Sequence, residues 1–485
     1  MIDTSRLGID YGVLLPELVV TATALLVLVL DLLIPPGRRR WLAAFSALGL
    51  LLALLATVPL WGADRSAFSG TVIGDSFAAF FDVVLLSTGL LTVLISPRFL
   101  RSLGLEYGEY YVLTLAAMAG MMLLAAATSL MTIFLGIELL SIALYVLAGF
   151  ARRSLRSQES ALKYLLLGGF ASGFLLYGMA LIYGATGATT LHGIAQFVGA
   201  SGSSVLLLVG IGFLVVGLAF KASAAPFHMW TPDVYQGAPT VVTTFMSVAT
   251  KAAAFAVIGR VFVAAFPTIR ADWYFPLAFV AIVSLGIGNF VAITQSNLKR
   301  LLAYSGIAQA GYILLGILPG SSEGLAASLF YVAAYAVMNF GAFAVVTAVE
   351  TRVGEGGTEI PAWTGLFYRQ PLLATTMTVF MLSLAGIPPT VGFFAKLFVF
   401  RPLVEAQLWA PLAVAIVTTV ISFYYYLRVV VVMLTAPEEA GRPAREPVSR
   451  VMGAILVFCS IATIVLGVFP TVVFDWARTA AAPHL

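Results

Sequence analysis

The most informative shortage in this sequence is of charged residues. They make up 10% of the 485 residues, whereas hydrophobic residues make up 61% and the mean hydropathy is +1.03. Soluble domains carry about 25% charged residues. The shortage excludes an ordinary soluble protein and predicts an all-α polytopic membrane protein.

Cysteine is nearly absent as well. The one cysteine, Cys459, excludes a disulfide within the chain, and the cysteine spacing of an iron–sulfur or zinc site is missing. No polar stretch is long enough for a nucleotide or flavin domain, and no glycine loop follows a strand. A basic stripe that would bind nucleic acid is also missing. We therefore expect no cofactor, no metal and no nucleic-acid partner for this chain itself.

Long apolar runs, by contrast, are abundant. About fourteen of them approach the roughly 20 residues that a helix needs to cross a bilayer. The loops between the runs are short, so the sequence predicts a single membrane domain over 1–485. The expected spans are 12–34, 41–62, 76–96, 109–127, 130–150, 160–185, 204–225, 239–265, 274–295, 301–318, 324–349, 372–400, 408–434 and 450–474.

Lysine and arginine are distributed unevenly between the two sets of loops. Loops after odd-numbered spans hold fifteen of these residues, and the opposite side holds five. Positively charged loops stay in the cytoplasm. The bias therefore predicts that both termini face away from the cytoplasm. The fifteen are Arg38, Arg39, Arg40, Arg98, Arg101, Arg152, Arg153, Arg156, Lys299, Arg300, Arg352, Arg369, Arg442, Arg445 and Arg450, and the five are Arg6, Arg65, Arg270, Arg401 and Arg478.

Two of the apolar runs are interrupted by proline. The seventh meets Pro226 at the start of a polar stretch, and the twelfth contains Pro388 and Pro389. Broken backbone at membrane depth is tolerated only where it is buried in protein or lines a wet cavity; a simple proline kink is the alternative. Broken helices five spans apart favour two inverted structural repeats, as in many transporters. The predicted parts are helices 1–3 over 1–108, a first repeat over 109–265, a second over 274–434 and a last helix over 450–474.

Lysine is scarce, and its placement is unusual. Lys163, Lys221, Lys251 and Lys396 fall within or at the edge of apolar runs, and only Lys299 falls in an obvious polar loop. An ionisable side chain at membrane depth costs roughly 2.5–3.5 kcal/mol on insertion scales, so its presence is by default a functional hypothesis. A buried ammonium can lose its proton, whereas a guanidinium effectively cannot. The pattern indicates a protein that moves protons or cations along titratable groups.

Glu138 is the one obvious acid in the first half, deep in the fifth run. An isolated carboxylate there is too costly, so we expect it to be paired or protonated, with Lys163, Lys221 and Lys251 as available partners. Burial and like-charge repulsion both favour neutral lysine, so at least one of the three should exchange protons. Lys163 lies near the end of its run and can alternatively extend to the surface. His228 is a further candidate, either as a relay or as a partner of the freed backbone.

Three stretches resemble a known family. They are FKASAAPFHMWTPDVYQGAP from Phe220 to Pro239, NLKRLLAYS from Asn297 to Ser305, and LSLAGIPPTVGFFAK from Leu382 to Lys396. All three are similar to membrane subunit N of bacterial NADH:quinone oxidoreductase (respiratory complex I) and to its mitochondrial counterpart, subunit 2. The likeness extends over nearly the whole chain. Gln309 departs from the family pattern, because many relatives carry histidine there.

The resemblance implies an antiporter-like, non-redox subunit of a proton-translocating enzyme in a bacterial inner membrane. NADH, FMN, iron–sulfur clusters and quinone would be held by other subunits. Its partners would be other membrane subunits, including the sister antiporter-like subunits, and the lipid bilayer. By the same likeness, Glu138 and Lys221 would form a charge pair that Lys163 modulates. Lys251 would be the central relay and Lys396 the exit-side proton site.

Two other classes of protein are alternatives. A subunit of a multi-subunit sodium/proton antiporter would share the broken helices, but a sodium site needs several oxygen ligands close together, and Glu138 alone is a poor start. A solute symporter would need a pocket with varied polar groups. The sequence instead predicts a core of lysine and aliphatic residues.

Overall fold

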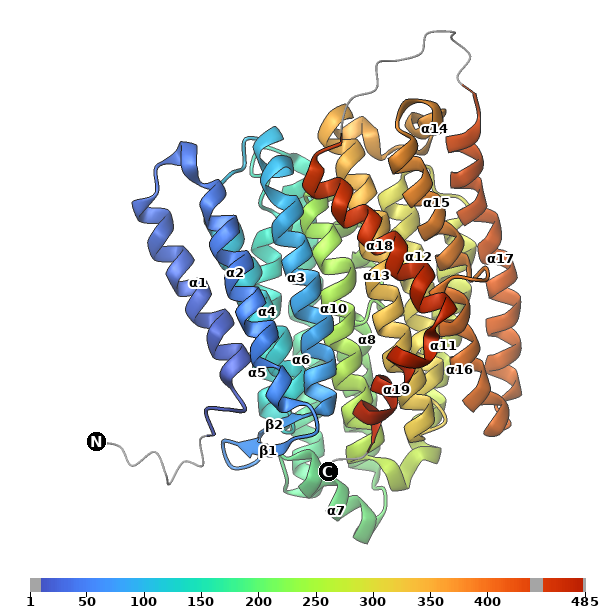
Figure 1. Ribbon diagram of the computed structural model, residues 1–485. Helices are drawn as coiled ribbons and strands as arrows, with labels where there is room; N and C mark the ends of the chain where they lie inside the picture. The colour runs from blue at the N-terminus through green and yellow to red at the C-terminus, as the bar shows by residue number, and fades with distance from the viewer. Residues whose placement is uncertain (1–9, 437–447, 483–485) are drawn as a thin grey trace.

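The computed structural model describes residues 10–436 and 448–482, and it is built almost entirely of helices (Figure 1). Within these residues, eleven helices are long and apolar enough to cross a membrane. The predicted all-α polytopic membrane fold is confirmed, while the count of fourteen spans stays a prediction. The long helices are α1 (Leu15–Leu33), α2 (Arg40–Ala56), α3 (Ser76–Ser102), α4 (Glu109–Ala126), α5 (Leu130–Ala148), α6 (Leu155–Thr186), α10 (Thr240–Arg260), α11 (Arg270–Ala292), α12 (Leu298–Ile317), α13 (Ser322–Val353), α17 (Trp409–Leu434) and α18 (Arg450–Val468).

Both predicted helix breaks are present. Residues 222–229 separate α8 (Val205–Lys221) from α9 (Trp230–Gly237), and residues 386–390 separate α15 (Pro371–Ala385) from α16 (Val391–Glu405). Gly386 caps α15 with a φ of 90°, a left-handed conformation that glycine adopts without a Cβ clash. A simple proline kink is therefore excluded at both places. The inverted relation of 109–265 to 274–434 stays a prediction.

Short elements that the hydropathy did not predict lie mostly at one end of the bundle. They are α7 (Leu191–Ser201), α19 (Pro470–Ala481) and an antiparallel hairpin of β1 (Asp64–Ala67) and β2 (Val72–Asp75), all at the lower end in Figure 1. The four-residue α14 (Leu366–Arg369) lies at the other end. Hydropathy detects long apolar runs, and it does not detect these elements because they are short and partly polar.

The upper end of the bundle in Figure 1 carries the loops that hold Arg39, Arg152 and Arg369, and we call it the arginine-rich end. In the described chain, α1 begins and α19 ends at the opposite end, which agrees with the two ends of the chain lying on one side. Which side faces the cytoplasm stays a prediction. Arg6, Arg442 and Arg445, which entered the charge count, lie outside the described residues.

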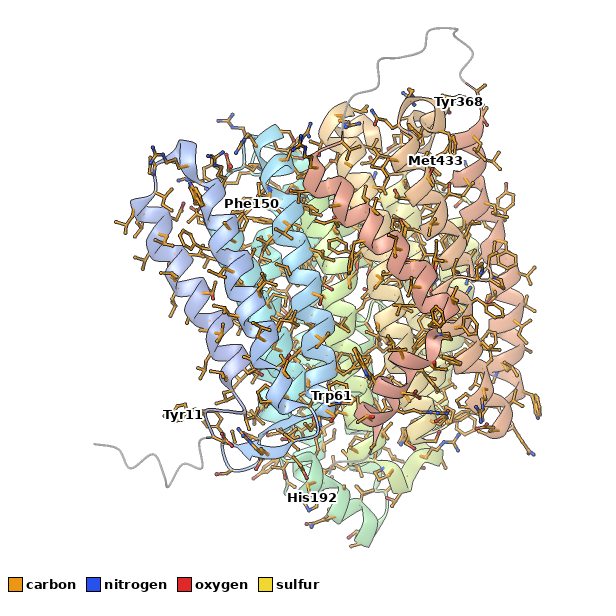
Figure 2. The ribbon with its side chains drawn as sticks, viewed as in Figure 1. Tyr11, Trp61, Phe150, His192, Tyr368 and Met433 are labelled. Carbon is orange, nitrogen blue, oxygen red and sulfur yellow. The ribbon has the colours of Figure 1, made fainter. Side chains whose placement is uncertain are left out.

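The bundle is apolar both outside and inside. Leu32, Leu135 and Phe170 are each at least 60% exposed, as expected of side chains that meet lipid or another membrane protein. Figure 2 shows side chains made mostly of carbon along the outside of the bundle, with Tyr11 and Tyr368 at its opposite ends. The most enclosed long helix is α10, which is buried along its whole length and packs on α3, α4 and α13. Because α10 carries Lys251, the central helix of the fold holds one of the predicted site residues.

Candidate functional site

Lys251 lies in the middle of α10 and is 1% exposed. Its Nζ donates hydrogen bonds to the carbonyl of Ala222, at 3.2 Å, and to that of Gly306 on α12, at 2.9 Å. Ala222 directly follows the end of α8, and the last carbonyls of a helix have no donor within the helix. The first helix break therefore supplies one of the two acceptors that hold Lys251.

Lys396 has a matching environment at the second helix break. It lies on α16 and is 4% exposed, and its Nζ donates to the carbonyl of Ala385, the last residue of α15, at 2.8 Å. The ring centroid of Tyr312 lies 4.9 Å from the same Nζ. Among the described residues, neither Lys251 nor Lys396 forms an ion pair with a carboxylate. Carbonyl dipoles and an aromatic face stabilise these two ammonium groups instead.

Polar side chains connect the surroundings of the two lysines. Next to Gly306, the hydroxyls of Ser305 and Tyr426 lie 2.5 Å apart. The amide nitrogen of Gln309 donates to Tyr426 at 3.1 Å and to the carbonyl of Leu384 at 3.3 Å. Leu384 is the neighbour of the residue that binds Lys396. Polar side chains of α12 and α17 therefore lie between Lys251 and the second break.

Lys221 and Glu138 do not contact each other directly, and the charge pair that the resemblance implied stays a prediction. The Nζ of Lys221, at the end of α8, donates to Ser141 at 2.6 Å, and the carboxylate of Glu138 accepts from Ser172 on α6 at 2.5 Å. Glu138 and Ser141 lie three residues apart on one face of α5. The lysine therefore contacts a serine that lies one helical turn from the glutamate.

Lys163 binds other acids than Glu138. Its Nζ lies 2.7 Å from Asp233 and 2.6 Å from Glu159, and its side chain is 41% exposed. Asp233 also pairs with Arg300, at 2.6 Å. The expectation that three lysines share one acid is therefore wrong for Lys163, which forms a partly exposed charge network with α9 and α12.

The remaining candidate, His228, lies in the first break and is half-buried. Its Nδ1 makes no hydrogen bond within the described residues, and its ring centroid lies 6.3 Å from that of Tyr304. Lys299 does not lie in a polar loop as expected: it belongs to the first turn of α12, is 2% exposed and donates to Ala238 at 2.8 Å. Asn297, a favourable N-cap residue, was the signal that placed the start of this helix.

Known proteins are similar to this chain in sequence and in the arrangement of helices. The family described as "NADH:quinone oxidoreductase/Mrp antiporter, TM" matches residues 127–422. NADH-quinone oxidoreductase subunit N of Trichlorobacter lovleyi is 44% identical over 475 residues, which cover 97% of each chain. This chain belongs to the subunit N family.

Solved structures agree with the family assignment. A chain of respiratory complex I from Thermus thermophilus with bound aureothin matches 95% of this chain and 98% of its own length, with a TM-score of 0.80 and 36% identity. A chain of the Mrp complex from Dietzia sp. matches with a TM-score of 0.84 at 23% identity, covering 98% and 97%, which shows a shared fold alone. This subunit N family member is a multi-pass membrane protein with an antiporter-like fold.

Hydroxyl and amide groups also belong to the site, and they were not among the residues predicted from the sequence. The core is not composed of lysine and aliphatic residues alone, because Ser305, Gln309 and Tyr312 line one side of α12 and Tyr331 donates to Gln309 at 2.5 Å. Their spacing of three to four residues was the available signal, since such residues share a helix face. In residues 10–436 and 448–482, no group of three or more histidine, cysteine or acidic residues could hold a metal ion.

Proposed function

We propose that this chain is the antiporter-like, proton-translocating subunit N of a NADH-quinone oxidoreductase. The observation that carries the proposal is the placement of Lys251 and Lys396 against the carbonyls of Ala222 and Ala385 at the two helix breaks. A lysine held by carbonyl dipoles can release its proton without leaving an unpaired buried carboxylate behind. Both lysines are therefore suited to carry protons. A lysine that served only in a structural ion pair would not need to release its proton.

In this proposal, protons pass between the two lysines along α12. The hydroxyls of Ser305 and Tyr426 can each accept and donate a proton, whereas the amide of Gln309 orients Tyr426 and does not itself titrate. This division of roles explains how the chain can work without a histidine at position 309. The route connects the end of Lys251 that faces Gly306 with the break that holds Lys396.

The other predicted site residues take their places around this route. Lys221, bound to Ser141, and Glu138, bound to Ser172, would set the charge beside the first break, and a proton that moves onto Glu138 would change the field at Lys221. Lys163 would act at a distance, through Asp233. His228 remains a candidate for hydrogen bonding at the break.

The energy for translocation would come from other subunits. We propose that this chain has no redox cofactor and that NADH, FMN, iron–sulfur clusters and quinone are bound elsewhere in the complex. The exposed apolar surface would contact lipid of a bacterial inner membrane and neighbouring membrane subunits, including sister antiporter-like subunits. Both termini would lie outside the cytoplasm.

Purification in mild detergent tests the assembly part of the proposal. The chain should copurify with a large complex that oxidises NADH and reduces quinone. Recovery in a small assembly that exchanges sodium for protons without redox activity would instead assign the chain to a multi-subunit sodium/proton antiporter.

A pair of variants on α16 tests the transport part. Lys396→Met removes the buried cation, and Arg401→Ala removes a cation of the same helix that is exposed and pairs with Glu405. In vesicles that contain the intact complex, we expect Lys396→Met to abolish or strongly reduce proton pumping. The matched surface variant should pump normally, because exposed pairs contribute only about 0–1 kcal/mol. Normal stoichiometry in Lys396→Met would refute the proposal.

A further inference from the structure

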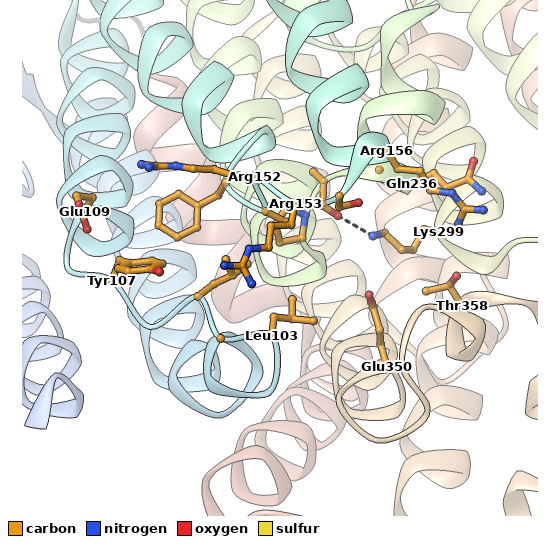
Figure 3. Close-up of a pocket in the computed structure, with 18 residues that line it drawn as sticks. Leu103, Tyr107, Glu109, Arg152, Arg153, Arg156, Gln236, Lys299, Glu350 and Thr358 are labelled. Carbon is orange, nitrogen blue, oxygen red and sulfur yellow. Dashed lines mark hydrogen bonds between the residues drawn. The ribbon is translucent and has the colours of Figure 1, made fainter. Parts of the chain in front are cut away.

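A cavity of about 660 Å³ lies at the arginine-rich end of the bundle (Figure 3). Figure 3 shows Lys299 and Glu350 on the same side of this cavity, with Arg153 across from them. Water that fills such a polar space can exchange protons with any carboxylate in its wall. The ionisable residues that line it are Tyr107, Glu109, Arg152, Arg153, Arg156, Lys299 and Glu350.

Glu350 connects this cavity to the central helix. It lies in the last turn of α13, and its carboxylate accepts a hydrogen bond from the hydroxyl of Thr240, in the first turn of α10. From this contact, polar side chains continue between α10 and α13 toward the middle of the bundle. We call this set the α10–α13 seam; it consists of Thr240, Thr244, Ser247, Asn339, Thr347 and Glu350.

The seam leads to Lys251. Its buried members are each 0% exposed. The hydroxyls of Thr244 and Thr347 lie 3.3 Å apart across the two helices, and the amide of Asn339 donates to Ser247 at 2.9 Å. Lys251 follows Ser247 by four residues and therefore lies on the same face of α10. The polar surface thus begins at the cavity and ends at the central lysine.

The inner end of the seam contains polar atoms without a protein partner. The Oδ1 of Asn339 and the hydroxyl of Tyr335 are buried and make no hydrogen bond within the described residues. A methyl group placed on Gly306 would lie 3.0 Å from the Tyr335 hydroxyl and 3.5 Å from the Nζ of Lys251. The Tyr335 hydroxyl and the Lys251 Nζ therefore both lie close to this glycine. Buried polar groups of this kind are usually satisfied by water. We therefore expect water to bind beside Lys251, at the inner end of the seam.

Helix packing explains only part of the seam. Thr244 and Thr347 also donate to backbone carbonyls one turn earlier, at 2.7 and 2.9 Å, which is ordinary for threonine in a membrane helix. Polar side chains of this type hold membrane helices together. A seam that only held the helices together would not need the Glu350 carboxylate at the cavity. It would also not need the unpaired Oδ1 of Asn339 at the inner end.

We infer that Glu350 is a proton-uptake group that takes protons from the cavity and passes them through the α10–α13 seam to Lys251. This inference rests on the proposed function. A proton leaves a hydronium ion in the cavity, binds a carboxylate oxygen of Glu350, and reaches the neutral amine of Lys251 through water and hydroxyl groups. Only O–H and N–H bonds form and break, so no oxidant or other co-reactant is needed.

Glu350→Gln tests the inference directly. Glutamine keeps an oxygen that accepts from Thr240 but cannot carry the proton, so the contact survives while the uptake group is lost. Losing a positioned acid–base group lowers rates by about 10²–10⁴, and we expect at least a roughly tenfold fall in proton pumping by the intact complex in vesicles. The loss of proton pumping should grow as the pH on the arginine-rich side rises, because without Glu350 the seam can receive protons only from hydronium ions in the cavity. Glu109→Gln, an exposed acid of the same cavity, is the control and should pump normally.

A second variant separates transport from assembly. Asn339→Leu replaces the inner amide with an apolar side chain of similar size and should reduce pumping in an assembled complex. If Glu350→Gln fails to assemble, this variant still tests whether protons pass through the seam. Normal pumping in both variants at every pH would overturn the uptake role. If Lys251→Arg is inactive in that case, the lysine relay stands and only the uptake path is wrong. If Lys251→Arg is also normal, the proposed function itself is wrong.

Discussion

Replacing Lys251 with arginine separates a proton carrier from a structural cation. The Nζ of Lys251 is buried and donates to the carbonyls of Ala222 and Gly306. Arginine keeps the positive charge and offers five donors, so both carbonyls can remain satisfied. Its larger side chain must fit beside Gly306, and overpacking of this kind costs about 1–3 kcal/mol. We therefore expect the variant complex to assemble with moderately reduced stability.

The expected effect on pumping is much larger than the effect on stability. Arginine holds its proton far more tightly than lysine, so essentially no side chain at position 251 would be neutral near pH 7. If each cycle requires a neutral side chain at position 251, pumping falls below detection. A cation that only holds α8 against α12 would tolerate the exchange, and pumping would stay near normal.

The assay is NADH-driven proton pumping by the intact complex in vesicles, normalised to the amount of assembled complex. Arg428→Lys is a matched control: Arg428 is half-buried and donates to the carbonyls of Ile293, at 3.1 Å, and Gln295, at 3.4 Å, in the connection between α11 and α12. This reverse exchange should leave pumping unchanged. Pumping by Lys251→Arg at the rate of the control would refute the relay role and leave Lys251 as a structural charge.

Two further predictions concern stability and topology. Asp75→Asn removes the acid of the buried bidentate pair with Arg260, whose two N–H···O distances are both 2.9 Å, and should cost about 3–5 kcal/mol, measured as a lower melting temperature of the purified complex. Asp10→Asn, at an exposed pair, should change it little. In a background without the native cysteine, single cysteines at Ser154 and Ser203 should label from opposite sides of the membrane; labelling of both from one side would contradict the topology.

Local chemistry determined the membrane class and the helix breaks. The shortage of charge and the apolar runs are properties of consecutive residues, and the proline stretches at Pro226 and Pro388 interrupt helices wherever those helices pack. The same holds for the depth of Lys221, Lys251 and Lys396, because position within a long apolar run sets depth in the membrane. These features needed no knowledge of neighbouring helices, so the sequence alone was sufficient for them.

The partners of each charged group were decided by tertiary structure. A residue on a helix that is buried on all sides has no apolar stripe to show which neighbour it faces, and α10 is such a helix. The sequence therefore could not predict that Ser141 would stand beside Lys221, or that Asp233 would bind Lys163. It also could not bring Glu350 to α10, since their contact joins residues 110 positions apart. Only the packing of α10 against α12 and α13 decided which polar groups surround the central lysine.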